Sequence, residues 1–107
     1  MRIFICILII IGAAALMIRC STPQNSLKPT ESDINKIKAD YPKASLSDLQ
    51  TGLNLYKRNC SGCHILYLPN SKTREQWEKL LPEMFSRTFL NKHEQELITQ
   101  YIFAKSI

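Results

Sequence analysis

The stretch that decides the fold is Cys60-Ser61-Gly62-Cys63-His64, in which two cysteines three positions apart are followed at once by a histidine. On a helical turn, positions i, i+3 and i+4 share one face, so both thiols and the imidazole point the same way. The two small residues between the cysteines leave room for a flat ring against the backbone. This C-x-x-C-H pattern is typical of covalent haem attachment. The sequence therefore predicts that Cys60 and Cys63 carry one haem c and that His64 is the proximal iron ligand.

Three other interpretations of the pentapeptide stay open beside the haem prediction. A thioredoxin-like redox dithiol requires a βαβ surround, and the chain has no strand–helix alternation. A structural zinc site requires four ligands, which only Cys60, Cys63, His64 and His93 could supply once a leader is removed. The direct adjacency of Cys63 and His64 also departs from the usual zinc spacings. A structural disulfide would leave the histidine without a role.

The N-terminal region has the pattern of an export signal. Arg2 precedes an unbroken apolar run over residues 3–18, which is shorter than the roughly 20 residues that a spanning helix needs. This favours a secretory signal peptide over residues 1–19, with a short uncleaved membrane anchor as the alternative. Cys20 follows at the position of the lipidated cysteine of a bacterial lipoprotein, although Arg19 stands where such signals usually have a small residue. We expect lipidation of Cys20, a flexible tether over residues 20–31 and a helical haem domain over residues 32–107.

The cysteine count bears on the cellular compartment expected for the protein, and the net charge bears on its expected partners. Removal of residues 1–19 takes Cys6 away, and Cys20, Cys60 and Cys63 are then all assigned, so no disulfide is needed. Because c-type haem is attached outside the cytoplasmic membrane, we expect the protein on the periplasmic side, anchored to the membrane by lipid. Residues 20–107 carry a net charge of +3, most of which two haem propionates would offset. No basic cluster interleaved with aromatic residues indicates nucleic-acid binding.

Hydrophobic spacing and helix-start signals predict an all-α domain. A short amphipathic helix is expected over residues 32–41, and a capping box at residues 47–50 predicts the start of a second helix. Gly52 lies inside this second helix, where a glycine costs up to about 1 kcal/mol relative to alanine. Its usual benefit is close approach by another helix, and the last helix is the expected partner.

Two further helices follow. A capping box at residues 73–76 opens the third helix, and Pro82 is expected to kink or end it near Leu81. A similar signal at residues 91–94 opens the last one. The expected apolar faces of the second, third and last helices are Leu49, Leu53, Tyr56 and Cys60; Trp77, Leu80, Leu81 and Met84; and Leu97, Ile98, Tyr101 and Ile102.

A longer pattern around the pentapeptide resembles a known family. The motif G-x-x-x-[aromatic]-x-x-x-C-x-x-C-H is formed by Gly52, Tyr56, Cys60, Cys63 and His64. It resembles the N-terminal helix of class I c-type cytochromes, which are small monohaem electron carriers, and the resemblance extends from about Leu49 to the C-terminus. It implies a small cytochrome c-like helical domain wrapped around one covalently attached haem. It also implies that the Pro69 carbonyl accepts the N–H of the proximal histidine.

The distal iron ligand decides between electron transfer and ligand binding. Met84 is the only methionine outside the leader and follows His64 by 20 positions, and in class I cytochromes the distal ligand is likewise a downstream methionine. A thioether favours Fe(II) and raises the reduction potential relative to bis-histidine ligation. His93 is the competing ligand, and an open distal position is the third alternative.

The expected function follows from that ligand. With Met84 bound, the protein is not an enzyme but a monohaem electron carrier between membrane respiratory complexes or periplasmic reductases. With an open position, it is a haem-containing subunit, a small peroxidase or a gas-binding protein. A zinc or dithiol module is the remaining alternative.

Haem is also expected to complete a core that about 60 residues could not build alone. Residues 65–68 are expected to line the haem pocket, and Trp77 to be either a propionate donor or a core residue. We expect the chain without haem to be largely unfolded. The residues expected to close around the macrocycle are Leu53, Leu66, Leu68, Leu80, Leu81, Phe85, Ile98 and Ile102.

Overall fold

The structure is built from helices whose first turns are capped by side chains. The computed structural model describes residues 27–60 and 66–107. They form α2 (Glu31–Ile37), α3 (Leu46–Cys60), α4 (Arg74–Ser86) and α5 (Lys92–Lys105), with a short 3-10 turn, η2 (Pro69–Ser71). The capping boxes of α4 and α5 begin at Thr73 and Asn91, as expected. No strand occurs in these two ranges, and the all-α prediction is confirmed for them.

Several predictions concern residues outside the described ranges and stay predictions. They are the signal peptide over residues 1–19, lipidation of Cys20, most of the tether, and the haem roles of Cys63 and His64. Within the described ranges, none of the helices combines the length and the hydropathy that crossing a bilayer requires.

Two helix boundaries differ from expectation, and a third decides between two alternatives. The first helix ends at Ile37, and a turn carries the chain to Pro42. The cap of α3 is Ser45, not Ser47: the Ser45 hydroxyl accepts from the Asp48 N–H at 3.1 Å, and the Asp48 carboxylate accepts from the Ser45 N–H at 2.9 Å. Of the two outcomes expected at Pro82, a kink or an end of α4 near Leu81, the end is excluded, because the helix continues through Pro82 to Ser86. Half-buried residues beyond the proline, Met84 and Phe85, pack against the core and hold this second half in place.

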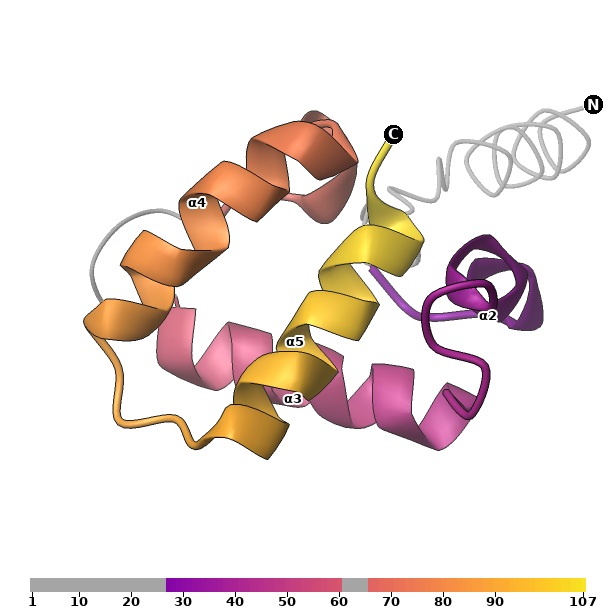
Figure 1. Cartoon of the computed structure of the whole chain (residues 1–107), viewed down its shortest axis with the longest axis horizontal. Helices are drawn as coiled ribbons and strands as arrows, with labels where there is room; N and C mark the ends of the chain where they lie inside the picture. Colours follow the sequence, from indigo (N-terminus) through magenta and orange to yellow (C-terminus); the bar gives the residue numbers. More distant parts are fainter. Residues whose placement is uncertain (1–26, 61–65) are drawn as a thin grey trace, which may run out of the picture.

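Helix α5 is the centre of the domain. It lies across α3, with α4 on one side and α2 on the other (Figure 1). Because neighbours surround it, burial extends beyond the single expected face to seven residues, as is usual for a central helix. They are Leu97, Ile98, Gln100, Tyr101, Ile102, Phe103 and Ala104.

The crossing of α3 and α5 depends on Gly52. A Cβ atom at this position would overlap the Leu97 carbonyl oxygen and lie 2.9 Å from the Tyr101 Cβ, a distance that real Cβ contacts do not show. The predicted close approach of the last helix to this glycine is therefore confirmed.

The N-terminal part of the described chain is attached to the C-terminal half of α5. The Tyr101 hydroxyl donates to the Leu27 carbonyl at 2.8 Å. Lys105 Nζ lies 2.8 Å from an Asp33 carboxylate oxygen, and the two side chains are only 13% and 7% exposed. Burial alone would raise the pKa of Asp33, but hydrogen bonds from Lys105 and Thr30 outweigh burial and hold this pKa below its ordinary value. Packing against α5 thus reaches back to Leu27.

Candidate cofactor site

Cys60 is the last residue of α3 and reaches the interior through the helical period. Leu49, Leu53, Tyr56 and Cys60 follow one another at spacings of four, three and four, and all four are buried, as predicted. The end of α3 therefore presents the Cys60 side chain to the inside of the domain, directly before the rest of the pentapeptide. Lys57 and Arg58 occupy the last turn, where cations interact favourably with the helix dipole.

A cavity of about 200 Å³, open to solvent, lies between the end of α3 and the second half of α4. Cys60 borders it from α3, and Leu80 and Met84, one helical turn apart, border it from α4. Tyr67, from the segment that follows the pentapeptide, borders it as well. The remaining lining residues are Asn59, Glu83, Arg87 and Thr88.

Two of the predicted site residues thus meet at one cavity. Cys60 is a thiol and Met84 a half-buried thioether, and the two come from different helices. Thiols attach haem c covalently, and a thioether is one of the groups that can serve as its distal ligand. The apolar walls from Leu80 and Tyr67 suit a flat, largely apolar ring. The described part of this donor set therefore fits a haem.

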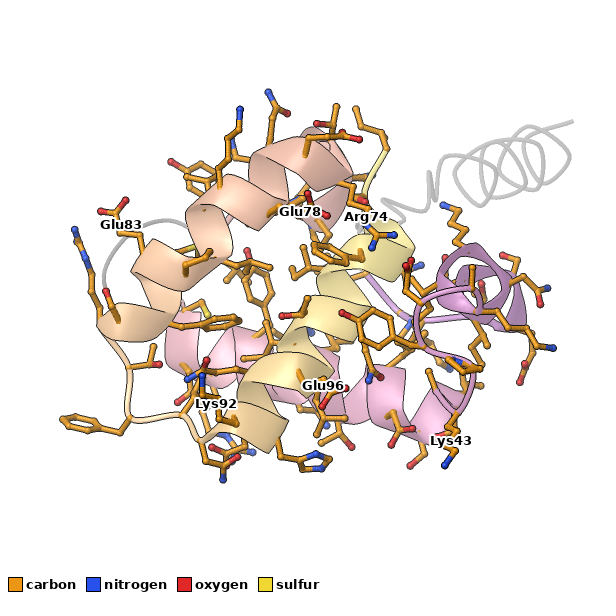
Figure 2. The ribbon with its side chains drawn as sticks, in the orientation of Figure 1. Lys43, Arg74, Glu78, Glu83, Lys92 and Glu96 are labelled. Atoms are coloured by element: carbon orange, nitrogen blue, oxygen red, sulfur yellow. The ribbon has the colours of Figure 1, made fainter. Side chains whose placement is uncertain are left out.

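Charged residues form the rim of the cavity. Arg87 Nη2 lies 3.0 Å from Glu83 Oε1, and both side chains are about two-thirds exposed, at 65% and 68%. Such an exposed i,i+4 pair adds little to stability. Glu83 is labelled near the outer end of α4 in Figure 2. The rim residues Asn59, Glu83, Arg87 and Thr88 carry no sequence pattern that predicts them, because only the fold of α4 brings this turn to the end of α3.

The segment after the pentapeptide is held by two buried aromatic residues. The Tyr56 hydroxyl donates to the Tyr67 carbonyl, and the Trp77 indole N–H donates to the Pro69 carbonyl, each at 2.8 Å. Trp77 is fully buried, and its single N–H is used here, so the structure places it in the core rather than at a propionate. The Pro69 carbonyl keeps a second lone pair, which leaves room for the implied bond from a histidine.

The buried Tyr56 phenol stays protonated. Its hydroxyl donates to a carbonyl oxygen, which cannot take up a proton at neutral pH. Burial raises the pKa of the Tyr56 phenol well above its ordinary value. The residue acts as a buried hydrogen-bond donor.

Most of the residues expected around a macrocycle lie elsewhere. Leu80 lines the cavity, whereas Leu53, Leu81, Ile98 and Ile102 are buried in the main core, and Leu66 and Phe85 pack against that core. Leu68 is 43% exposed, and of residues 66–68 only Tyr67 borders the cavity. The packing of α3 and α4 against α5 therefore uses most of the apolar residues that were expected to contact haem.

His93 lies away from this cavity. It is exposed in the first turn of α5 and borders a second cavity with Asp48, at the start of α3. Lys43 borders the same second cavity and lies on the opposite side of the molecule from Glu83 (Figure 2). Asp48 and Cys60 are twelve positions apart on the same helix, which is about 18 Å along the axis. The structure therefore supports His93 neither as a distal ligand nor as a zinc ligand together with Cys60.

Metal-ligand clusters are absent from the described ranges: no three His, Cys, Asp or Glu side chains within residues 27–60 and 66–107 are grouped to hold an ion. Cys63 and His64 lie outside these ranges. Comparison of the chain with protein families, curated proteins and solved structures found no match.

Proposed function

We propose that the protein is a monohaem c-type electron carrier. The observation that carries this proposal is that Cys60 and Met84, assigned to haem from the sequence, border one cavity although 24 positions separate them. Haem c supplies a one-electron Fe(III)/Fe(II) couple. Cys60 and Cys63 would hold the ring covalently, and His64 and Met84 would be the iron ligands.

The open side of the cavity supports electron transfer rather than substrate turnover. A ring held there keeps an edge at the surface, beside Tyr67 and the Glu83–Arg87 pair. With Met84 as the second protein ligand, the iron would keep no open position for a peroxide or a gas. The acceptors and donors we propose are membrane respiratory complexes or periplasmic reductases.

The test is an optical spectrum of the full chain, exported by a strain that matures c-type haem. A pyridine haemochrome of the c type is expected, together with a sulfur-to-iron charge-transfer band in the oxidised protein. Met84→Ala should abolish the band and retain the haemochrome. Leu80→Ala, which truncates an apolar neighbour on the same cavity wall, should retain both. A band that survives Met84→Ala would refute Met84 as the ligand.

Two other results would select the alternative functions. Rapid binding of carbon monoxide to the reduced wild-type protein indicates an open distal site, and thus a peroxidase or gas-binding protein. Stoichiometric zinc without covalent haem indicates a metal module.

The proposed location is the periplasmic side of a membrane, with Cys20 as the lipid anchor. Cys20→Ser should move the exported protein from the membrane fraction to the soluble fraction without changing its haem spectrum. Retention of this variant in the membrane would indicate that the apolar run over residues 3–18 is itself the anchor.

A further inference from the structure

Two fully buried aromatic residues bind the backbone that leaves the pentapeptide. Tyr56 on α3 donates its hydroxyl to the carbonyl of Tyr67, and Trp77 on α4 donates its indole N–H to the carbonyl of Pro69. Both bonds are 2.8 Å long, and both donors have no exposed surface. Tyr67 is the third residue after His64. The segment is therefore fixed shortly after the proposed iron ligand.

The two donors form one unit. Their rings meet edge to face, with centroids 6.3 Å apart and an interplanar angle of 87°. Tyr56 also lies one helical turn before Cys60, on the same buried face of α3. The last turn of α3 thus has two roles: it presents Cys60, and through Tyr56 it holds the chain that follows the pentapeptide. Helix α4, which presents Met84, supplies the second bond through Trp77.

We propose that Tyr56 and Trp77 are positioning residues that set the reduction potential of the iron by fixing residues 67–69. This inference rests on the proposed function. Groups behind the first ligands orient those ligands, and water access and burial control the potential. Loss of either bond frees the segment beside the cavity and admits water, which favours the more highly charged Fe(III) state. The potential should therefore fall.

The molecule contains a matched control for this idea. Tyr101 is also fully buried, and its hydroxyl also donates to a carbonyl at 2.8 Å, but that carbonyl belongs to Leu27. Tyr56→Phe and Tyr101→Phe each delete one hydroxyl and leave the ring in place. If the bonds serve stability alone, the two variants should behave alike.

The experiment measures the midpoint potential, the charge-transfer band and the thermal unfolding temperature of the exported holoprotein. We expect Tyr56→Phe to lower the equilibrium constant for reduction about tenfold, equivalent to about 59 mV for one electron. Its band should weaken at a lower pH than in the wild type, as Met84 becomes easier to displace. Tyr101→Phe should change neither quantity, while both variants should lose similar amounts of thermal stability.

Trp77→Phe provides a second route should Tyr56→Phe fail to fold. It keeps an aromatic ring in the core, removes the other donor and should shift the potential in the same direction. If Tyr56→Phe and Trp77→Phe have the same midpoint potential as Tyr101→Phe, the inference is overturned, but the haem assignment is not affected. A wild-type protein without a haemochrome would instead overturn the proposed function, and the inference with it.

Discussion

The surroundings of α5 and the cavity between α3 and α4 are organised differently. Around α5, backbone approaches backbone at Gly52, aromatic rings fill the space and a buried ion pair closes the end. At the cavity, sulfur-bearing side chains border open space under an exposed salt bridge. Packing explains the residues of the first region. In the second, Cys60 and Met84 also pack against the core, and the proposed haem gives a further reason for a thiol and a thioether at one cavity.

The largest effect is expected from Gly52→Val, which tests the close packing around α5. The added side chain meets the Leu97 carbonyl, which cannot move without displacing α5, and overpacking of this kind should cost about 3 kcal/mol or more of unfolding free energy. Thr51→Val places the same residue one position away on the exposed side of α3 and should change little. Urea unfolding of both variants makes the comparison. Equal midpoints would show that α3 and α5 do not approach closely at Gly52.

The second test removes the ion pair between α2 and α5. Asp33→Asn leaves the Lys105 ammonium with 13% exposure and no ionised partner at 2.8 Å, and hydrogen bonds to charged groups contribute about 1.5–3 kcal/mol. We expect a loss of about 2 kcal/mol in a urea titration. Glu31→Gln, an exposed change in the same helical turn, should have little effect. If both variants behave alike, α2 is not held by Lys105.

The same pair should give a distinct pH dependence. Asp33 has a folded-state pKa below its ordinary value of 3.8, so its stabilising contribution is complete above that value and is lost as pH falls through the lower folded-state pKa. The unfolding temperature of the wild type should therefore decline below about pH 4. Asp33→Asn should decline less steeply over this interval. Parallel curves for the two proteins would contradict the assigned pKa direction.

The two regions also differ in how far sequence alone predicts them. Gly52 predicted the close approach of another helix, because a glycine inside a helix costs stability that such an approach can justify. The caps at Thr73 and Asn91 were recognisable because a polar side chain three positions before a Glu or Gln serves few other purposes. At α3 this pattern begins at Ser47, three positions before Gln50, and it overlaps a related pair, Ser45 and Asp48, which forms the actual cap.

Other features depend on contacts that no local pattern contains. Pro82 lies inside α4 because both halves of this helix are anchored to the core. Glu83 and Arg87 form the rim because α4 brings them to the end of α3. The cavity residues Cys60 and Met84 were named from the sequence for chemical reasons, whereas their shared cavity is a property of the fold. The roles of Cys63 and His64 stay predictions.

Met84→Leu separates chemistry from packing at the cavity. Leucine has a similar volume, and Met84 is only half-buried, so the loss of unfolding free energy should stay below about 1.5 kcal/mol. The charge-transfer band should nevertheless vanish, because leucine has no sulfur. Denaturant unfolding and the oxidised spectrum, recorded on one sample, test both statements. A large loss of stability with an intact band would make Met84 a core residue.

The smallest effect is expected at Phe89, in the connection between α4 and α5. Its side chain is as exposed as in an extended peptide, so Phe89→Ser should change the unfolding free energy by less than about 0.5 kcal/mol. Phe103→Ser is the matched change at a buried phenylalanine of α5, beneath the Arg74 guanidinium, and should cost several times more. A fall in the unfolding temperature on Phe89→Ser comparable to that of Phe103→Ser would mean that Phe89 is buried in solution. Because Phe89 follows Thr88, which borders the cavity, a buried Phe89 side chain would then belong to the cavity wall.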